Sequence, residues 1–396
     1  MGSTKSVALK YLGALTAAGA IAAAASMAWA TAPVAAASQF VVGFANPITG
    51  AEATYGVSDQ HAVEMAAAQI NKAGGVLGQQ IKIISCDTQA TPAIGVACAN
   101  AFVSDHVNAV IGFFNSSISI PASAILHTAN IPMVTGASTN PTLTLQGFKN
   151  VFRLCGTDNY QGAVEADFAY KQLHVKRVVV LNDEETYGQG VSSFFSSTFK
   201  KLGGTVVAPQ GINAAAADFS SVLTQIKGIT PAIQAIQFGG FNPAAGLLVK
   251  QARALGITVP FITDDGVIGP LFYQTGGAAT VGSYLSSAPS PQDLAHVKGA
   301  SKSAQTFLKA YVAKYGQPTN FAAYNYDCLY VLASAAKAEH GTSAKDLIKG
   351  LAATHKYQGV TGIVNFNKIG NNVTPQYLMY KVQSNGGNKI FWNPNA

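Results

Sequence analysis

Residues 110–123, "VIGFFNSSISIPAS", join an apolar run to a segment rich in hydroxyl groups. The apolar half is typical of a buried strand, and the small residues after it favour a helix. A strand that opens directly into a helix brings backbone N–H groups and short polar side chains to one point. Ser116, Ser117 and Ser119 therefore form either an ordinary capped helix start or part of a binding site for an anion.

The alternation of strand and helix continues on both sides of this stretch. A helix is expected at 57–72, where apolar residues recur on one face and Gly74 and Gly75 follow as a stop signal. Such alternation predicts an α/β fold built from parallel sheets with helices on both faces. The predicted strands lie at 40–45, 81–85, 108–114, 132–135, 177–182, 205–209, 232–239 and 260–263.

These strands form two series, one from 40 to about 150 and one from about 177 to 285, and each is long enough for a domain. Two facing parallel sheets would enclose one cleft, lined by the loops at the carboxyl ends of their strands. After the second series the chain returns to long helices and then to further strands. These later elements are expected at 301–315, 322–338, 362–366 and 376–383.

The composition allows two hydrophobic cores. The chain has 396 residues, of which 48% are hydrophobic and only 11% are charged. Its formal net charge of +7 falls to +5 without residues 1–37, because Lys5 and Lys10 are the only charges there. The remaining Lys and Arg residues are scattered rather than gathered in a stripe, which argues against nucleic acid as a partner.

Residues 1–37 have the layout of a secretory signal peptide: a basic start, an apolar middle and a stretch of small residues. Cleavage is expected after Ala30 or Ala37. The alternative is an N-terminal membrane anchor, but the apolar run is shorter than the about 20 residues that a span needs and is diluted by Ala and Gly. We therefore expect the protein to be exported.

Four cysteines allow three pairings, and an oxidising compartment permits any of them. Cys86 ends a predicted strand and Cys98 lies in the following helix, so a local disulfide between them is one expectation. Cys155 and Cys328 then either form a second disulfide or remain buried free thiols. Neither CxxC nor a Cys/His zinc spacing occurs, so no metal site is expected.

A second polar loop, "VTGASTNPT" at 134–142, also follows a predicted strand. Ala137 and Ser138 keep this loop small, so that a ligand can approach the backbone. Thr139 adds a hydroxyl and an N–H group. The alternative is a simple turn ahead of Pro141.

The second series of strands carries three further loops. Tyr187 would place an aromatic ring at the mouth of the cleft, whereas the acids at 183–185 before it are more typical of a solvated loop than of a metal or acid–base site. Phe241, after two glycines, offers a flat apolar surface. Asp264 and Asp265 end a strand, and a single carboxylate facing the cleft would suit an ammonium group. In each case the alternative is an ordinary turn or helix cap.

Enzyme signatures are missing from the sequence. There is no GxSxG, HExxH or GxxxxGK[ST] motif, and no GxGxxG follows a strand. The seven histidines lie in helical or loop runs away from the five polar loops. Without a base beside it, Ser116 is expected to hydrogen-bond rather than act as a nucleophile. We therefore expect no catalysis and no cofactor; the competing hypothesis is an exported serine hydrolase with its serine at 116–119.

Seven motifs in order resemble one family over nearly the whole chain after the signal segment: "TGAEATYG", "GFFNSSISIPAS", "VTGASTNPTLT", "FRLCGTDNYQG", "ETYGQG", "FGGFNP" and "DDGV". The family is the leucine/isoleucine/valine-binding group of periplasmic receptors for bacterial ABC importers. The resemblance implies a type I two-lobed fold with a three-strand hinge that closes on a ligand. The implied lobes are 38–156 plus 286–374 and 157–285 plus 375–396.

The resemblance also implies a function and a site. A branched-chain or other neutral amino acid is captured by a monomer and delivered to the permease subunits in the membrane. Ser116 and Thr139 would hold its carboxylate, Asp265 would hold its ammonium group, and the backbone carbonyl of Ala137 would point toward the ammonium group. Ser138 would also contact the ligand. The walls of the side-chain pocket would be Tyr55, Tyr187, Phe241 and, from one end of a helix, Phe321 or Tyr324.

Three departures leave the side chain of the ligand open. Asp265 stands where the enteric branched-chain receptors have Glu, and Phe241 stands where they have Tyr. The cysteine pair of those receptors falls at Ala90 and Asn115. A receptor of the same fold for an aromatic acid or amide is an alternative, although such ligands lack the ammonium group that Asp265 implies. A sensory ectodomain is a third hypothesis.

Overall fold

The computed structural model describes residues 39–296 and 302–394, so the predicted signal segment lies outside the described residues. The first sheet is entirely parallel, as the strand–helix alternation predicts. Its five strands, in spatial order, are β2 (Ile81–Asp87), β1 (Phe40–Asn46), β3 (Ala109–Gly112), β4 (Met133–Thr135) and β5 (Val151–Arg153).

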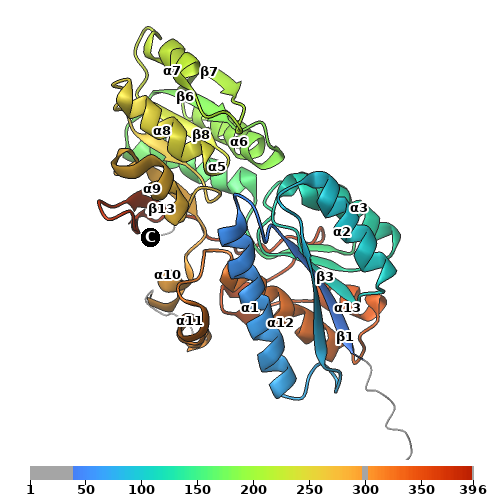
Figure 1. Ribbon diagram of the computed structural model, residues 1–396. Helices are drawn as coiled ribbons and strands as arrows, with labels where there is room; N and C mark the ends of the chain where they lie inside the picture. Colours follow the sequence, from blue (N-terminus) through green and yellow to red (C-terminus); the bar gives the residue numbers. More distant parts are fainter. Residues whose placement is uncertain (1–38, 297–301, 395–396) are drawn as a thin grey trace, which may run out of the picture. The chain divides into compact units, whose positions relative to one another are not determined.

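Helices cover both faces of this sheet because successive side chains of a strand point to opposite faces. In β3, Ala109 and Ile111 pack in the core formed with α1 (Ala53–Lys72) and α12 (Ala322–Ala338). Val110, between them, packs in the core on the other face, beneath α2 (Pro92–Ser104) and α3 (Ser116–Thr128). Figure 1 shows these two layers on either side of the strands.

The second sheet has seven strands and is mixed. The strands β6 to β10 run parallel, and β13 and β14 add an antiparallel pair at the β10 edge. The spatial order is β14 (Asn388–Trp392), β13 (Leu378–Val382), β10 (Tyr284–Ser287), β9 (Phe261–Thr263), β8 (Ala235–Gly239), β6 (Arg177–Asn182) and β7 (Thr205–Gly211).

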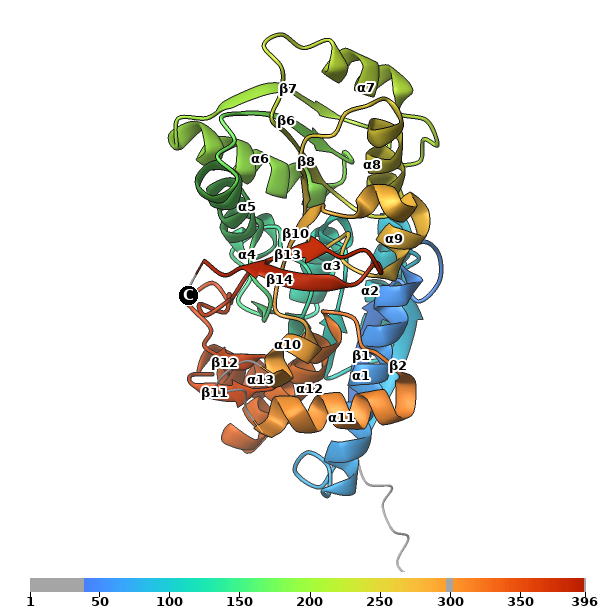
Figure 2. The same cartoon turned by 90° about the vertical axis from the view of Figure 1, so that its left-hand side faces the viewer.

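The same alternation builds two cores around the second sheet. Val179 and Leu181 of β6 pack with the helices of one face, and Val178 and Val180 pack with those of the other. Figure 2 shows the sheet between the two groups of helices. One face carries α5 (Asp158–Asp167), the π-helical turn at Phe168–Gln172 and α6 (Thr186–Lys201), and the other carries α7 (Ser220–Lys227), α8 (Ala244–Ala254) and α9 (Pro270–Gly276).

The chain passes between the two sheets three times: after β5, after β10 and before β13. The segment between β10 and β13 returns to the core of α1 and α12. A short antiparallel hairpin lies outside both sheets. The remaining elements are α4 (Thr142–Leu145), a 3₁₀ turn at Gly277–Thr280, α10 (Pro291–His296), α11 (Lys302–Tyr315), α13 (Ala344–Ala352) and the hairpin strands β11 (Tyr357–Gly359) and β12 (Gly362–Val364).

Most predicted elements are present with small changes in their ends. The helix predicted at 322–338 has these bounds, whereas α1 begins at Ala53 rather than at 57. Gly74 and Gly75, which follow α1, both have positive φ, as a helix stop requires. The prediction lacks the strands β10, β11 and β14. β10 pairs with β13, which is distant in the chain, whereas β14 follows β13 directly and pairs with it as a hairpin.

The structure joins Cys86 and Cys98 by a disulfide, while Cys155 and Cys328 are free thiols buried in the core around α12. Among the described residues, no helix has the length and apolar character needed to cross a membrane. The same part of the chain contains no cluster of three or more His, Cys, Asp or Glu side chains arranged to hold a metal ion.

Candidate functional site

Loops from both sheets meet at a small cavity. Its lining residues follow the carboxyl ends of β3, β4, β8 and β9 or begin α6 and α12, which is where open parallel sheets bind ligands. The side chains nearly fill the cavity, and the remaining space of about 10 Å³ has room for about one water molecule. The lining residues are Phe114, Ser116, Ala137, Thr139, Tyr187, Phe241, Asp265, Gly266 and Phe321.

The first sheet contributes uncharged polar groups to this cavity. Ser116 is the first residue of α3, and the N-cap residue Asn115 makes no side-chain hydrogen bond to the helix. The N-terminus of α3 therefore lacks a side-chain cap, and such helix ends attract anions. The backbone N–H of Asn140 donates to Ser116 Oγ at 3.2 Å, which ties the loop after β4 to the start of α3.

Ser138, predicted to contact the ligand, supports the loops instead of lining the cavity. Its hydroxyl donates to the carbonyl oxygens of Phe113 at 3.0 Å and Phe114 at 2.9 Å. Thr135 donates to the same Phe113 carbonyl and accepts from the N–H groups of Ala137 and Ser138. These buried hydroxyls hold the loops after β3 and β4 together, so that Ser116 and Thr139 border one cavity.

The second sheet contributes a carboxylate. Asp265 is 2% exposed, and the hydroxyl of Tyr187 donates to its Oδ1 at 2.5 Å. Its Oδ2 is buried and accepts no hydrogen bond within the part of the chain that the structure describes. Burial raises the pKa of Asp265 to about 6, although polar interactions with the side chains of Tyr187, Gln161 and Tyr377 lower it. An unpartnered carboxylate oxygen in a cavity is a site for a cationic hydrogen-bond donor.

The neighbouring acids have structural roles. Asp264 accepts hydrogen bonds from the N–H groups of Gly240 at 2.8 Å and Gly266 at 3.1 Å. Asp183 likewise accepts from the N–H groups of Glu185 and Phe241. Burial raises the pKa of Asp183 to about 7 and that of Asp264 well above its usual range. Both carboxyls cross-link loops, so Asp265 is the acid of this group that lines the cavity.

Aromatic rings form the apolar wall. Phe114 stacks on Tyr55 with ring centroids 5.3 Å apart and meets the edge of Phe321 at 5.2 Å. From the second sheet, Phe241 lies 6.3 Å from Phe114 and 5.2 Å from Tyr187, measured between ring centroids. This wall suits an apolar side chain of a ligand.

Two of the predicted wall residues lie behind this surface. Tyr55 packs against Phe114 but does not line the cavity; its hydroxyl donates across to the carbonyl oxygens of Ile268 at 2.7 Å and Gly266 at 3.3 Å. Tyr324 lies in the hydrophobic core with α1, because its position on α12 faces the first sheet. Of the two alternatives at this helix, Phe321 therefore borders the cavity.

Sequence reasoning missed Phe114 and Glu52. Phe114 is the last residue of the strand predicted at 108–114 and was not named as a site residue. In the structure Phe113 packs in the core beneath α3, while Phe114 joins the aromatic wall. The period of two along a strand could have separated these neighbours. Glu52, directly before α1, accepts a hydrogen bond from the Asn115 side chain at 2.8 Å, and burial raises its pKa to about 7.

Comparison with known proteins identifies the family. The sequence model of the periplasmic binding proteins matches residues 39–388. The chain belongs to the periplasmic binding protein family. This binding protein is 31% identical to Leu/Ile/Val-binding protein homolog 1 of Brucella abortus, over 88% of this chain and 92% of that one. It is 34% identical to an amino acid binding protein of Pseudomonas aeruginosa, over 87% and 91% of the two chains.

Solved structures agree with the type I periplasmic binding protein fold predicted from the sequence. A leucine binding protein, LivK, from Thermotoga maritima is 30% identical with a TM-score of 0.83, over 90% of this binding protein and 99% of that chain. LivJ from Streptococcus pneumoniae, solved in complex with isoleucine, is 30% identical with a TM-score of 0.81, over 89% and 98%. The predicted family and fold are therefore confirmed.

Proposed function

We propose that this protein is the solute-binding component of an ABC importer and that it captures a branched-chain or other neutral amino acid. The observation that carries the proposal is the pairing of opposite chemistries in one cavity. Asp265 offers an unpartnered carboxylate oxygen, while Ser116, Thr139 and the start of α3 offer neutral donors. A zwitterion is the small molecule that matches both ends.

The ligand contacts follow from this arrangement. The ammonium group of the amino acid donates to Oδ2 of Asp265 and to the backbone carbonyl of Ala137. Its carboxylate accepts from Ser116, Thr139 and backbone N–H groups at the start of α3. The apolar side chain contacts Phe114, Phe241, Phe321 and the ring of Tyr187. The name of the Brucella relative, Leu/Ile/Val-binding protein homolog 1, and the isoleucine bound to LivJ of Streptococcus pneumoniae support an aliphatic side chain.

Binding requires the two halves of the cavity to separate and close again, because its present space suits about one water. We assign the moving lobes to 38–156 plus 286–374 and to 157–285 plus 375–396. The cores support this division, since the clusters of the first sheet take residues from the chain up to Cys155 and from 288 to 366. Those of the second sheet take residues between 160 and 285 and between 377 and 392.

A catalytic role is not part of this proposal. None of the nine residues that line the cavity is a histidine or lysine, so Ser116 has no base beside it within the lining. An active-site serine probe should leave the protein unlabelled. Labelling at Ser116 would instead support the hydrolase hypothesis.

We also propose that residues 1–37 direct export and are removed after Ala30 or Ala37, and that the closed, monomeric receptor docks on permease subunits in the membrane. Membership of a periplasmic binding protein family supports this location. N-terminal sequencing of the protein recovered from the periplasm would identify the cleavage site. A protein recovered with its first 37 residues in the membrane fraction would support the anchor instead.

Ligand analogues test the zwitterion directly. Protein that has been unfolded, dialysed and refolded is titrated by calorimetry with Leu, Ile, Val, Ala and Phe, and then with 4-methylpentanoate, leucinamide and benzoate. We expect binding of at least one neutral amino acid. 4-Methylpentanoate lacks the ammonium group and leucinamide lacks the carboxylate, so each should bind about 100-fold more weakly or not at all. Tight binding of benzoate without any amino acid would overturn the proposal.

A further inference from the structure

A second surface of the first half of the molecule carries no part of the amino-acid cavity. It is a groove of about 580 Å³ bordered by residues around the starts of β4 and β5 and by α13. Asn130 precedes β4 and Val151 begins β5, so the groove lies at the amino ends of these strands. The amino-acid cavity lies at their carboxyl ends, and the two sites share no lining residue.

The floor of this groove is apolar. The rings of Phe152 and Phe366 are buried there with centroids 5.1 Å apart. Phe148 is half-buried and stacks on His127, and Ile348 and Ile369 are also half-buried. Such a floor favours contact with apolar side chains.

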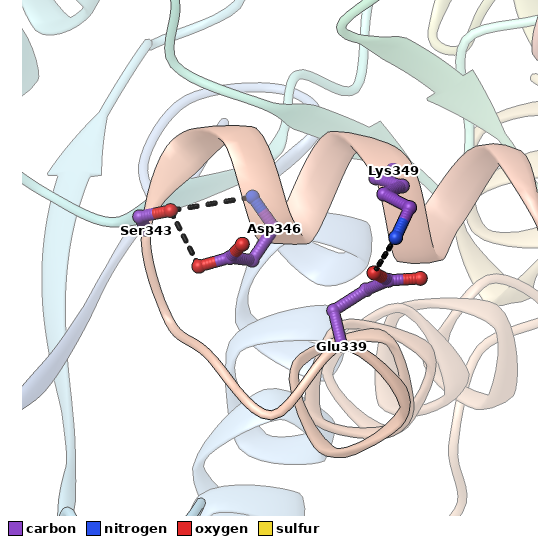
Figure 3. A network of polar contacts seen from close by, with 4 residues as sticks. All are labelled: Glu339, Ser343, Asp346 and Lys349. Carbon is purple, nitrogen blue, oxygen red and sulfur yellow. Dashed lines mark hydrogen bonds and ion pairs between the residues drawn. The ribbon is translucent and has the colours of Figure 1, made fainter.

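Four exposed lysines border the groove, namely Lys149, Lys345, Lys349 and Lys368, and none of its lining residues is acidic. Figure 3 shows the hydrogen bonds and the ion pair made by two acidic residues beside these lysines, Glu339 and Asp346. Glu339 forms an ion pair with Lys349 at 2.5 Å. At the start of α13, the hydroxyl of Ser343 donates to the carboxylate of Asp346 and accepts from the backbone N–H of Asp346. Lys149, Lys345 and Lys368 have no ion pair within the described residues, so three positive charges face an apolar floor.

The positive charge around this groove is local and is not spread evenly over the surface of this basic protein. A neighbouring groove of about 620 Å³ has no charged lining residue. The two grooves share the lining residues Asn367 and Ile369 and are therefore adjacent. The second groove carries Leu145, which is 68% exposed, and Val373, which is 55% exposed. This side of the molecule therefore has a basic groove and, beside it, an uncharged groove with two exposed apolar side chains. The second groove also takes Thr157, Asn159, Tyr160 and Phe194 from the other lobe.

We propose that this surface binds an extended segment of a partner protein, with its acidic residues over the lysines and its apolar residues over Leu145 and Val373. Small-molecule pockets enclose most of their ligand, whereas two adjacent, open grooves suit an elongated chain. Charge complementarity selects an acidic segment. A second copy of this protein is disfavoured, because the chain carries a net charge of +5 once residues 1–37 are removed.

The test uses the exported protein and a labelled peptide of designed sequence, acetyl-DEFDEGLVL-amide, in fluorescence anisotropy. Two comparison peptides replace the acids with lysine or the apolar residues with serine. We expect the designed peptide to bind more tightly than both, and to bind about tenfold more weakly in high salt. Lys149→Glu combined with Lys368→Glu should weaken binding about tenfold or more. Leu145→Ser combined with Val373→Ser should also weaken it.

Matched controls separate the groove from general electrostatic attraction. Lys200→Glu combined with Lys201→Glu makes the same charge change at the end of α6 and should leave peptide affinity within about threefold of the unmodified protein. Lys349→Gln should also have little effect, because Lys349 is already paired with Glu339. Amino-acid binding and the thermal midpoint should be unchanged in all these variants, which shows that they fold.

Several results would overturn the proposal. The first is no binding of the designed peptide at millimolar concentration. The second is that the serine-containing peptide binds as tightly as the designed peptide. The third is that the Lys200/Lys201 control variant loses as much affinity as the Lys149/Lys368 variant. Binding to phosphatidylglycerol vesicles without peptide binding would assign the surface to a lipid. Dimers that depend on Lys149 and Lys368 in sedimentation would assign it to a second copy.

Discussion

The two faces of the amino-acid cavity use opposite chemistry. The face from the first sheet carries hydroxyls and an uncapped helix start and no charged side chain, whereas the face from the second sheet carries Asp265. Neutral donors bind a carboxylate without a buried cation, while an ammonium group needs a carboxylate partner. This asymmetry orients a zwitterion in the cavity. Substitutions in the two faces should therefore weaken ligand binding to different extents.

Removing the charge of the acidic face should have the largest effect. We expect Asp265→Asn to weaken amino-acid binding about 100-fold or more, because the ammonium group would be buried without a counter-charge. Calorimetry on the refolded variant measures this loss. Asp105→Asn, at an exposed helix end, is the matched control and should bind normally. Equal affinities for the Asp265 variant and the unmodified protein would remove the basis of the proposed site.

Protons should compete with the ligand for the same face. The pKa of Asp265 is raised to about 6, so its carboxylate is ionised at pH 7 and becomes neutral as the pH falls through 6. Affinity should be constant above about pH 7 and fall about tenfold for each pH unit below 6. Titrations from pH 8 to pH 5 measure this. In Asp265→Asn the fall should vanish, although Glu52 and Asp183 still titrate near 7.

Removing one donor from the neutral face should weaken ligand binding less, because several donors share the carboxylate of the ligand. Ser116→Ala should weaken binding of the amino acid about tenfold, the usual size for one hydrogen bond to a charged group. The affinity for leucinamide, which has no carboxylate, should fall much less in the Ser116→Ala variant. Ser117→Ala is the control, since Ser117 does not line the cavity. A similar loss in both serine variants would indicate damage to α3 rather than a lost ligand contact.

The smallest effect is expected at the contact that joins the two faces. Tyr55→Phe removes the hydrogen bonds to Ile268 and Gly266 without changing the ring, and should weaken binding about threefold by favouring separation of the halves. Calorimetry and small-angle scattering would measure both changes. Tyr311→Phe removes a buried hydroxyl bonded to Ser58 within the first core. Its affinity should be unchanged, and a loss equal to that of Tyr55→Phe would contradict a joining role.

The disulfide illustrates what local sequence can and cannot predict. Cys86 and Cys98 lie at the end of a strand and in the next helix, so their closeness could be inferred from neighbouring elements. Cys155 and Cys328 are far apart in the chain, and either pairing or free thiols were possible. Only the packing of α12 against the first sheet places them in the core as free thiols.

The sequence by itself determined the order of strands and helices, the α/β class and the loops that carry Ser116, Thr139 and Asp265. These features depend on hydrophobic period, glycine stops and capping residues, which act over a few neighbouring positions. Tertiary structure alone decided that Phe114 joins the wall, that Ser138 supports loops and that Tyr324 enters the core. Such choices depend on which face of each element meets distant segments, and no local pattern contains that information.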